Sequence, residues 1–172
     1  MIQKISIFII ACVVLLSVQA NAISEQNAVP AVNAVTQTAT SLGVLTCAKR
    51  INEIATFLTA NSKSGAFVFP PSKQQPDKSV FSSSMEINPA NAPAMYASAS
   101  FYPNSNNGCD AIYDTVEYVD DLCANVETSV FKNGTRIGKI KKDIVIMAVG
   151  QVKFFLMPAG QGCVVIKKEI LQ

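Results

Sequence analysis

The chain has no histidine and no tryptophan, and charged residues make up only 15% of its 172 residues. Without histidine, the commonest general base and metal ligand is absent. The sequence also contains no Gly-x-Ser-x-Gly motif, no phosphate-binding loop and no dinucleotide-binding fingerprint. We therefore expect a protein that is not an enzyme and that has no cofactor and no metal site.

The N-terminus has the layout of a secretory signal peptide. Lys4 precedes an apolar run over residues 5–18, and Ala20-Asn21-Ala22 forms a small-x-small cleavage site. This run is shorter than the about 20 apolar residues of a membrane span. We expect a signal peptide over residues 1–22, cleaved after Ala22, and a secreted or periplasmic chain whose mature part has no transmembrane span.

The mature chain has almost no net charge. Loss of Lys4 from the 14 basic residues leaves 13, against 12 acidic ones. Proteins that bind nucleic acid normally carry a basic excess that neutralises phosphates. We expect no nucleic acid among the partners, which should be another protein or an envelope component.

Four cysteines remain after cleavage, because Cys12 leaves with the signal peptide; they are Cys47, Cys109, Cys123 and Cys163. An even number of cysteines in an exported chain predicts two disulfides. Structural zinc sites use cysteines two to four residues apart, or histidine, and this spacing is much wider. The cysteines therefore predict a framework of two disulfides.

The segment 109–123 limits how these cysteines pair. Its apolar spacing fits a helix and its Thr, Val and Tyr content fits a strand, so both structures stay open. As one regular element it would separate Cys109 from Cys123 by about 21 Å or more, beyond the about 7 Å between Cα atoms that a disulfide allows. Of the two remaining pairings, Cys47–Cys109 with Cys123–Cys163 closes the shorter loops and is favoured over Cys47–Cys123 with Cys109–Cys163.

Hydrophobic periodicity predicts an α+β fold. Residues 44–60 form an amphipathic pattern, and β-type patterns separated by turn residues follow from Ala66 onward. Candidate strands are 79–87, 94–102, part of 109–119, 127–132, 135–149, 152–157 and 163–170. We expect an N-terminal amphipathic helix packed on an antiparallel meander of about 5–7 strands, in a single domain over residues 44–172. Residues 23–43 should form a linker or a loosely docked lead-in.

The hairpin over residues 144–157 is apolar along both of its strands. Nearly continuous runs of this kind are typical of strands that are covered on both faces. One helix covers only one face, so the second cover is either another part of this chain or another protein. An oligomer therefore stays open.

Two charge clusters are candidate sites. The carboxylates are Asp110, Asp114, Glu117, Asp120 and Asp121, and the basic side chains are Lys132, Arg136, Lys139, Lys141 and Lys142. We interpret the first as a solvated polar face, because it lacks the spacing of a calcium loop. In a strand, Lys139 and Lys141 would point to one face and Arg136 and Lys142 to the other. The basic set is a candidate interaction surface, although basic flanks also protect strand edges.

These features favour an exported, non-enzymatic binding or interaction module of the cell envelope or extracellular space, including an inhibitor of a secreted enzyme. One alternative is a structural subunit that pairs or packs through the 144–157 hairpin. A second alternative is a small hydrolase that uses two of the five carboxylates.

Overall fold

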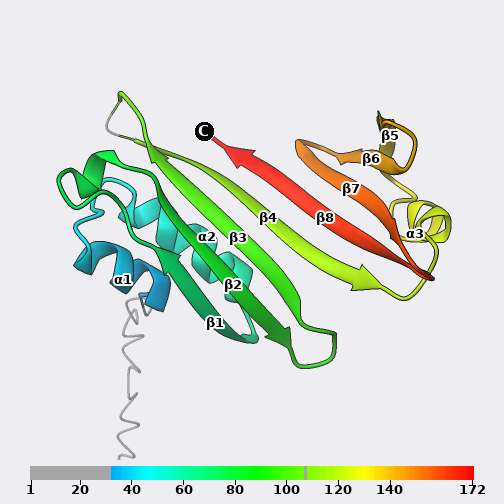
Figure 1. The fold of residues 1–172 in the computed structure, drawn as a ribbon, viewed down its shortest axis with the longest axis horizontal. Helices are drawn as coiled ribbons and strands as arrows, with labels where there is room; N and C mark the ends of the chain where they lie inside the picture. The colour runs from blue at the N-terminus through cyan, green and yellow to red at the C-terminus, as the bar shows by residue number, and fades with distance from the viewer. Residues whose placement is uncertain (1–31, 107) are drawn as a thin grey trace, which may run out of the picture. The chain divides into compact units, whose positions relative to one another are not determined.

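The computed structural model of the protein describes residues 32–106 and 108–172 (Figure 1). The predicted signal peptide lies outside these residues. The described residues form one compact unit. The described residues form α1 (Ala34–Ser41), α2 (Ala48–Thr59), β1 (Ser62–Phe69), a 3-10 helix η1 (Pro76–Lys78), β2 (Phe81–Pro89), β3 (Met95–Pro103), β4 (Cys109–Val119), α3 (Cys123–Ser129), β5 (Thr135–Ile140), β6 (Ile144–Val149), β7 (Val152–Ala159) and β8 (Gly162–Leu171).

All eight of these strands belong to one antiparallel sheet, in the order β1-β2-β3-β4-β8-β7-β6-β5. Strands β1 to β4 form a first meander, and β5 to β8 form a second one. The two meanders join where β4 pairs with β8, with Val116 opposite Ile166. As a result, the sheet has two edge strands, β1 and β5.

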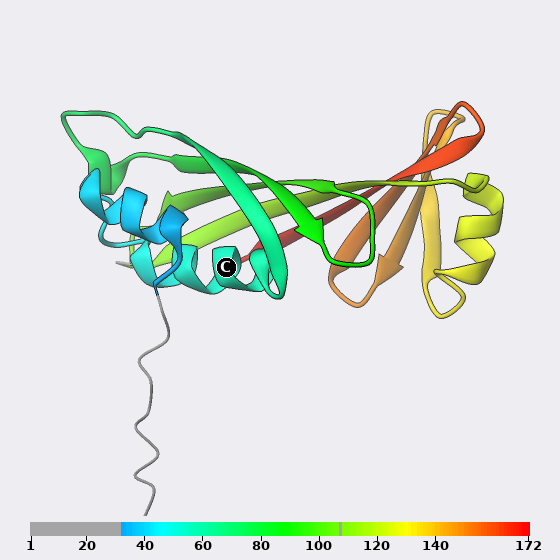
Figure 2. The same cartoon turned by 90° about the horizontal axis from the view of Figure 1, so that it is seen from below.

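The pairing register divides the strand side chains between two faces. One face, which we call the open face, carries the even-numbered residues of β2, β3, β4, β6 and β8 and the odd-numbered residues of β1 and β7. In β5, whose register shifts, it carries Thr135, Gly138 and Ile140. The opposite, covered face packs against α1 and α2 in the first meander and against α3 in the second (Figure 2). Within the described residues, no helix packs on the open face.

The amphipathic pattern of α2 explains the core of the first meander. Its apolar residues recur at three- and four-residue intervals, which places Ile51, Ile54 and Leu58 on one buried side. They pack with Phe81 and Phe101 from the covered face of β2 and β3. The predicted helix over 44–60 is therefore present, although it is shorter at its start.

Part of the stretch interpreted as a linker is helical. In α1, Val35 and Ala39 are buried in the first core, and the Asn33 side chain accepts a hydrogen bond from the backbone N–H of Val35 at 2.9 Å. The backbone N–H of Asn33 donates to Asn52 Oδ1 on α2 at 3.0 Å. Small, uncharged side chains such as these carry little periodic signal, and only their packing against α2 shows that the helix belongs to the domain.

The second core lies under α3, where sequence analysis predicted a strand over 127–132. That prediction is wrong, because residues up to Ser129 belong to α3 and Val126, 1% exposed, packs against Met147, Leu156 and Val165. Tertiary burial has overridden the β preference of this segment. The Asn133-Gly134 turn consequently links α3 to β5.

The sheet has more strands than the five to seven expected. The predicted strand 135–149 divides into β5 and β6 at a turn in which Lys141 adopts a left-handed backbone with φ 50°. Residues 62–69, whose early part carries little strand signal, form β1. The ambiguous segment is a strand, β4, up to Val119 and enters α3 at Cys123.

The structure pairs Cys47 with Cys109 and Cys123 with Cys163. This is the pairing that loop lengths favoured. Each disulfide ties the start of a helix to a strand of the sheet, one in each meander. Two disulfides indicate an oxidising environment, extracellular or periplasmic.

The apolar hairpin formed by β6 and β7 has only one covered face. Val145, Met147 and Leu156 are buried under α3, whereas Ile146 and Phe155 lie half-buried on the open face. The expectation of cover on both faces is therefore not met by the described residues.

Candidate interaction face

The open face carries a set of exposed aromatic rings. The exposed fractions are 65% for Phe67, 50% for Phe69, 47% for Tyr96, 37% for Tyr102 and 49% for Tyr118. They come from β1, β3 and β4, and the registers of these strands place all five on the same face. Exposed aromatic side chains gathered on one surface are typical of binding sites, because rigid rings bury a large area with little loss of conformational freedom.

Between these rings the first meander presents hydroxyl groups. Ser82 and Ser100 share a hydrogen bond at 2.9 Å, and Ser84 shares one with the hydroxyl of Tyr96 at 2.8 Å. Ser98 donates to Asp114 at 3.2 Å. A mixture of tyrosine and serine is also the usual composition of antibody paratopes, in which hydroxyl groups adapt to the partner's donors and acceptors.

The open face of the second meander is mainly apolar. Its half-buried apolar side chains are Ile144, Ile146, Phe155, Met157, Val164 and Ile166. At the junction with β4, Tyr118 lies over Gly162, where a Cβ atom would come within 2.6 Å of the tyrosine ring. Sheet faces of this composition normally pack against a second layer.

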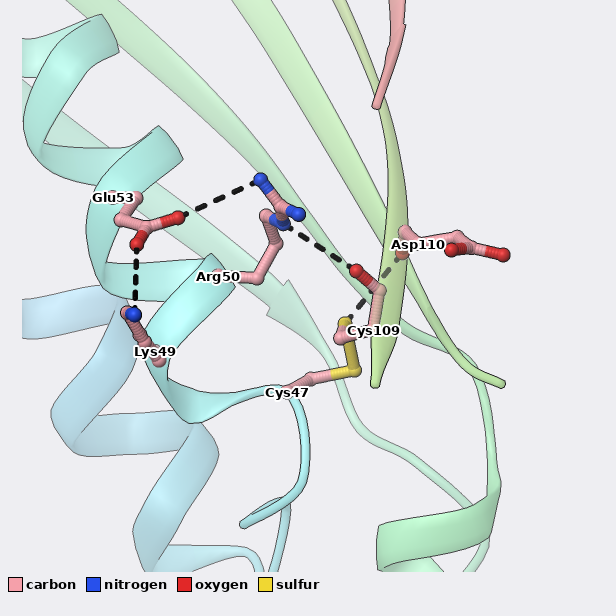
Figure 3. Close-up of polar contacts among 6 residues, drawn as sticks. All are labelled: Cys47, Lys49, Arg50, Glu53, Cys109 and Asp110. Atoms are coloured by element: carbon pink, nitrogen blue, oxygen red, sulfur yellow. Dashed lines mark hydrogen bonds and ion pairs between the residues drawn. A yellow bond between two sulfur atoms is a disulfide. The ribbon is translucent and has the colours of Figure 1, made fainter. Parts of the chain in front are cut away.

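The Cys47–Cys109 disulfide holds α2 on the opposite, covered face (Figure 3). Beside it, Arg50 Nε donates to the carbonyl of Cys109 at 3.4 Å. Glu53 pairs with Arg50 at 3.6 Å and with Lys49 at 4.0 Å. These exposed ion pairs contribute little to stability. They are the charges expected on the solvent-facing surface of a helix.

The turn before α2 is held by the carboxylate of Asp77. It accepts hydrogen bonds from the backbone N–H groups of Leu45 and Thr46, both at 2.6 Å, and from the hydroxyl of Thr46 at 2.9 Å. The hydrogen bond from the Thr46 N–H is the largest cause that lowers the pKa of Asp77. This contact explains why η1 lies against the start of α2.

A polar cluster occupies the covered face between the two cores. Tyr113 is 2% exposed, and its hydroxyl donates to Glu169 and accepts from Lys167 at 2.7 Å. The Lys167 ammonium also lies 5.2 Å from the centre of the Phe57 ring. Burial, followed by the contact with Glu169, raises the pKa of Tyr113. The members of the cluster satisfy one another's hydrogen bonds, so we assign the cluster a structural role.

The five carboxylates proposed as one cluster are separated in the structure. Asp110 and Asp114 lie on the open face of β4, Glu117 faces the covered side, and Asp120 and Asp121 lie in the turn before α3. Four residues apart in a strand, Asp110 and Asp114 are about 14 Å apart, whereas glycosidase carboxylates are about 5–9.5 Å apart. Asp110 binds the side chain of Asn104, and Asp114 forms an ion pair with Lys168.

The basic residues are also divided, and their predicted arrangement is wrong. A β-bulge at Ile137 puts Arg136 and Lys139 on the same, covered face, where Arg136 pairs with Glu127 of α3 at 3.3 Å. The other three members, Lys132, Lys141 and Lys142, lie in turns. The bulge, which Gly138 inside the predicted strand could have indicated, changes the alternation of the strand.

One Ser-x-x-Lys sequence, from Ser129 to Lys132, lies at the end of α3. The Ser129 hydroxyl donates to the backbone carbonyl of Asn125 at 2.7 Å. An activated nucleophile instead donates to a neighbouring base. This serine terminates a helix.

The alternation of side chains along the predicted strands is the sequence signal that could have identified the aromatic set. Along β3, Tyr96, Ser98, Ser100 and Tyr102 alternate with Ala97, Ala99 and Phe101. The period of two assigns these groups to opposite faces. The signal was present, although it does not show which face a helix covers.

Comparison with protein-family models, with curated proteins and with solved structures found no match for this chain. None of the helices in residues 32–106 and 108–172 has both the length and the hydropathy of a membrane span.

Proposed function

We propose that this chain is an exported, non-enzymatic module that binds another protein of the envelope or extracellular space through its open face. The observation that carries the proposal is the set of five exposed aromatic rings on a sheet face that no described helix covers. Both disulfides tie helices to the sheet at the covered face, so the open face stays presented on a rigid scaffold.

The charge around this face indicates what the partner should carry. The open face carries charges of both signs: Lys153 lies beside the apolar residues, Lys168 pairs with Asp114, and Glu86 and Asp110 lie on the first meander. A face that combines apolar and aromatic side chains with charges of both signs fits a partner surface that is apolar in its middle and carries complementary charges at its rim. We expect binding to weaken as salt concentration rises, because exposed charges are screened.

The experiment compares capture by the wild type with capture by two variants. Tagged mature protein is incubated with the native envelope and secreted fractions, and the proteins that it retains are identified. Tyr96→Ala combined with Tyr102→Ala should abolish retention of the partner, since both rings belong to the open face. The control Phe57→Ala removes a ring that is 60% exposed on α2 and should keep retention.

Two results would contradict the proposal. One is a partner that is lost with Phe57→Ala and kept by the open-face variant. The other is a hydrolytic activity of the wild type that is lost when the five carboxylates Asp110, Asp114, Glu117, Asp120 and Asp121 are replaced by amides in a folded protein, which would favour the hydrolase alternative.

A second candidate function is the structural subunit. The half-buried apolar residues of β6, β7 and β8 on the open face support it, because such a face packs against another layer. In that case Phe155→Lys would prevent assembly while the isolated chain stays folded.

A further inference from the structure

The two edges of the sheet differ in their protection against pairing. β5 carries a bulge and two basic side chains, Arg136 and Lys139. β1 pairs with β2 without a bulge over eight residues, of which only Lys63 is charged. Edge strands normally carry charges, prolines or bulges that prevent pairing with another chain. In β1 the charge of Lys63 and the prolines Pro70 and Pro71 lie towards the two ends, so residues 64–69 form an unprotected edge (Figure 1).

Within the described residues, the side chains of β1 are incompletely covered on both faces of the sheet. Phe67 and Phe69 are exposed on the open face, with ring centres 5.1 Å apart. On the covered face Ala66 is exposed and Val68 is only half-buried. A further strand beside β1 would cover both pairs.

A hollow lies on the open face at Gly65. A Cβ atom at this glycine would meet no atom within 4 Å. The hollow has a volume of about 510 Å³, and Phe67, Glu86 and Tyr96 are among its lining residues. An aromatic side chain from a neighbouring strand would fill it, as in the cross-strand pairing of glycine with aromatic residues.

We propose that β1 pairs antiparallel with β1 of a second copy of this chain, in a register centred on Ala66. In this register Gly65 lies directly opposite Phe67 of the second copy. Directly opposite Cβ positions are about 4.5–5.5 Å apart, so each Phe67 ring reaches the hollow of the other copy. The two open faces become continuous across a two-fold axis.

The partner of β1 is a second copy because the strand is complementary to itself: each copy carries both the Phe67 ring and the hollow at Gly65 that this ring fills. A register centred on Ala66 pairs residues 63–69 and places Lys63 opposite Phe69, with the two lysines about 20 Å apart. Centring on Gly65 would oppose two glycines and leave both hollows empty. Centring on Phe67 would pair only residues 65–69 of the strand.

The interface is small. One strand pair buries less than the about 1,200–2,000 Å² of a stable complex, so we expect a reversible dimer with a dissociation constant in the micromolar range or weaker. Its formation should depend on protein concentration.

The test introduces a charged side chain at Ala66, the residue on which the register is centred. Ala66 is exposed in the single chain, so Ala66→Glu and Ala66→Lys should leave the monomer folded, as circular dichroism would verify. Sedimentation of the mature protein should show a concentration-dependent dimer for the wild type. Each variant should lower dimer affinity about tenfold, because like charges lie directly opposite one another. An equimolar mixture of the two variants should restore dimerisation, since opposite charges then meet.

A control variant carries the same added charge on the other edge. Thr135→Glu on β5 should leave the dimer unchanged. The inference is overturned if the wild type stays monomeric up to about 1 mM, if Ala66→Glu has no effect, or if the mixture fails to restore the dimer. A monomeric protein that still retained its partner in the capture experiment would overturn this inference and leave the proposed function standing.

Discussion

The burial of a strand residue in this protein depends on which face of the sheet its side chain occupies. Adjacent residues of β7 illustrate this: Leu156 is fully buried under α3, whereas Phe155 is half-buried on the open face. Phe154 belongs to the covered face, where its ring centre lies 4.7 Å from that of Phe131. The apolar sequence of this strand does not distinguish the three, because each carries a large apolar side chain.

The same charged substitution should therefore change the unfolding free energy by different amounts at Phe155 and at its neighbour Leu156. We expect Phe155→Lys to cost about 1 kcal/mol or less of unfolding free energy, since its ammonium can reach water. Leu156→Lys should cost at least about 4 kcal/mol or prevent folding, because it buries an unpaired charge. Urea denaturation of both variants measures the difference. Equal costs would mean that both faces of the hairpin are covered.

Asp77 should make the fold sensitive to acid. Its pKa is lowered in the folded protein by the Thr46 N–H, so its contribution is complete above the ordinary carboxyl range and is lost as the pH falls through the folded pKa. Asp77→Ala should cost about 1 kcal/mol at neutral pH and progressively less in acid. Thermal unfolding between pH 7 and pH 2 tests this. Asp143→Ala, in the turn after β5, is the control and should cost little at any pH. A cost for Asp77→Ala that stayed constant with pH would contradict the prediction.

Tyr113 should make the fold sensitive to alkali. Burial raises its pKa, so the folded state favours the neutral phenol and loses this advantage as the pH rises above the ordinary tyrosine value of about 10. Tyr113→Phe should cost about 1 kcal/mol at pH 7, because Glu169 and Lys167 lose a hydrogen-bond partner. Above pH 10, the difference between the two proteins should diminish. A wild type that lost no stability relative to the variant would exclude this linkage.

At the scale of elements, each meander has its own helix cover and its own disulfide. The amphipathic pattern of α2 and the alternation of β2 and β3 could be predicted from local sequence, since the period shows which residues share a face. The α3 helix could not, because its valine and threonine residues favour strands and only burial of Val126 in the second core selects a helix. The separation of the five carboxylates follows from β4 being a strand, which the sequence left open.

Removal of either disulfide should destabilise the protein by a similar amount. Cys47–Cys109 and Cys123–Cys163 span 62 and 40 residues. Because the entropic benefit depends on the logarithm of loop length, replacing either pair by alanine should cost about 4 kcal/mol. Hydrogen exchange should become faster mainly in the meander that lost its bridge. Intact-mass analysis with thiol labelling should find no free cysteine in the mature wild type, and two labelled cysteines would contradict the pairing.

At the scale of the whole described unit, the two meanders share one sheet and carry opposite charge. Residues 32–119, which contain α1, α2 and the first meander, have five basic and six acidic side chains, whereas residues 120–172, which contain α3 and the second meander, have eight basic and five acidic ones. The near-zero total concealed this division. The open face therefore has an aromatic and hydroxyl-rich half and an apolar half with basic side chains nearby.

An exposed apolar half-face should bind a hydrophobic dye in the folded state. We expect the wild type to bind anilinonaphthalene sulfonate under native conditions, since an uncovered apolar surface is available to it. Ile146→Lys should reduce the fluorescence, because Ile146 lies on the open face. Thr128→Lys, exposed on α3, adds the same charge elsewhere and should leave it unchanged. Equal fluorescence in all three proteins would show that another part of the molecule binds the dye.

The sequence by itself determined the local features of this protein: the amphipathic helix, several strands, their turns and the even number of cysteines. Spacing and side-chain chemistry are sufficient for these, because they depend on residues close in the chain. Only the tertiary structure decided which apolar face is covered, that α1 joins the core and that β1 is an unprotected edge. These properties arise because β4 pairs with β8, which are about fifty residues apart in the chain, and because the helices pack on one side of the sheet. No local pattern encodes contacts between such distant segments.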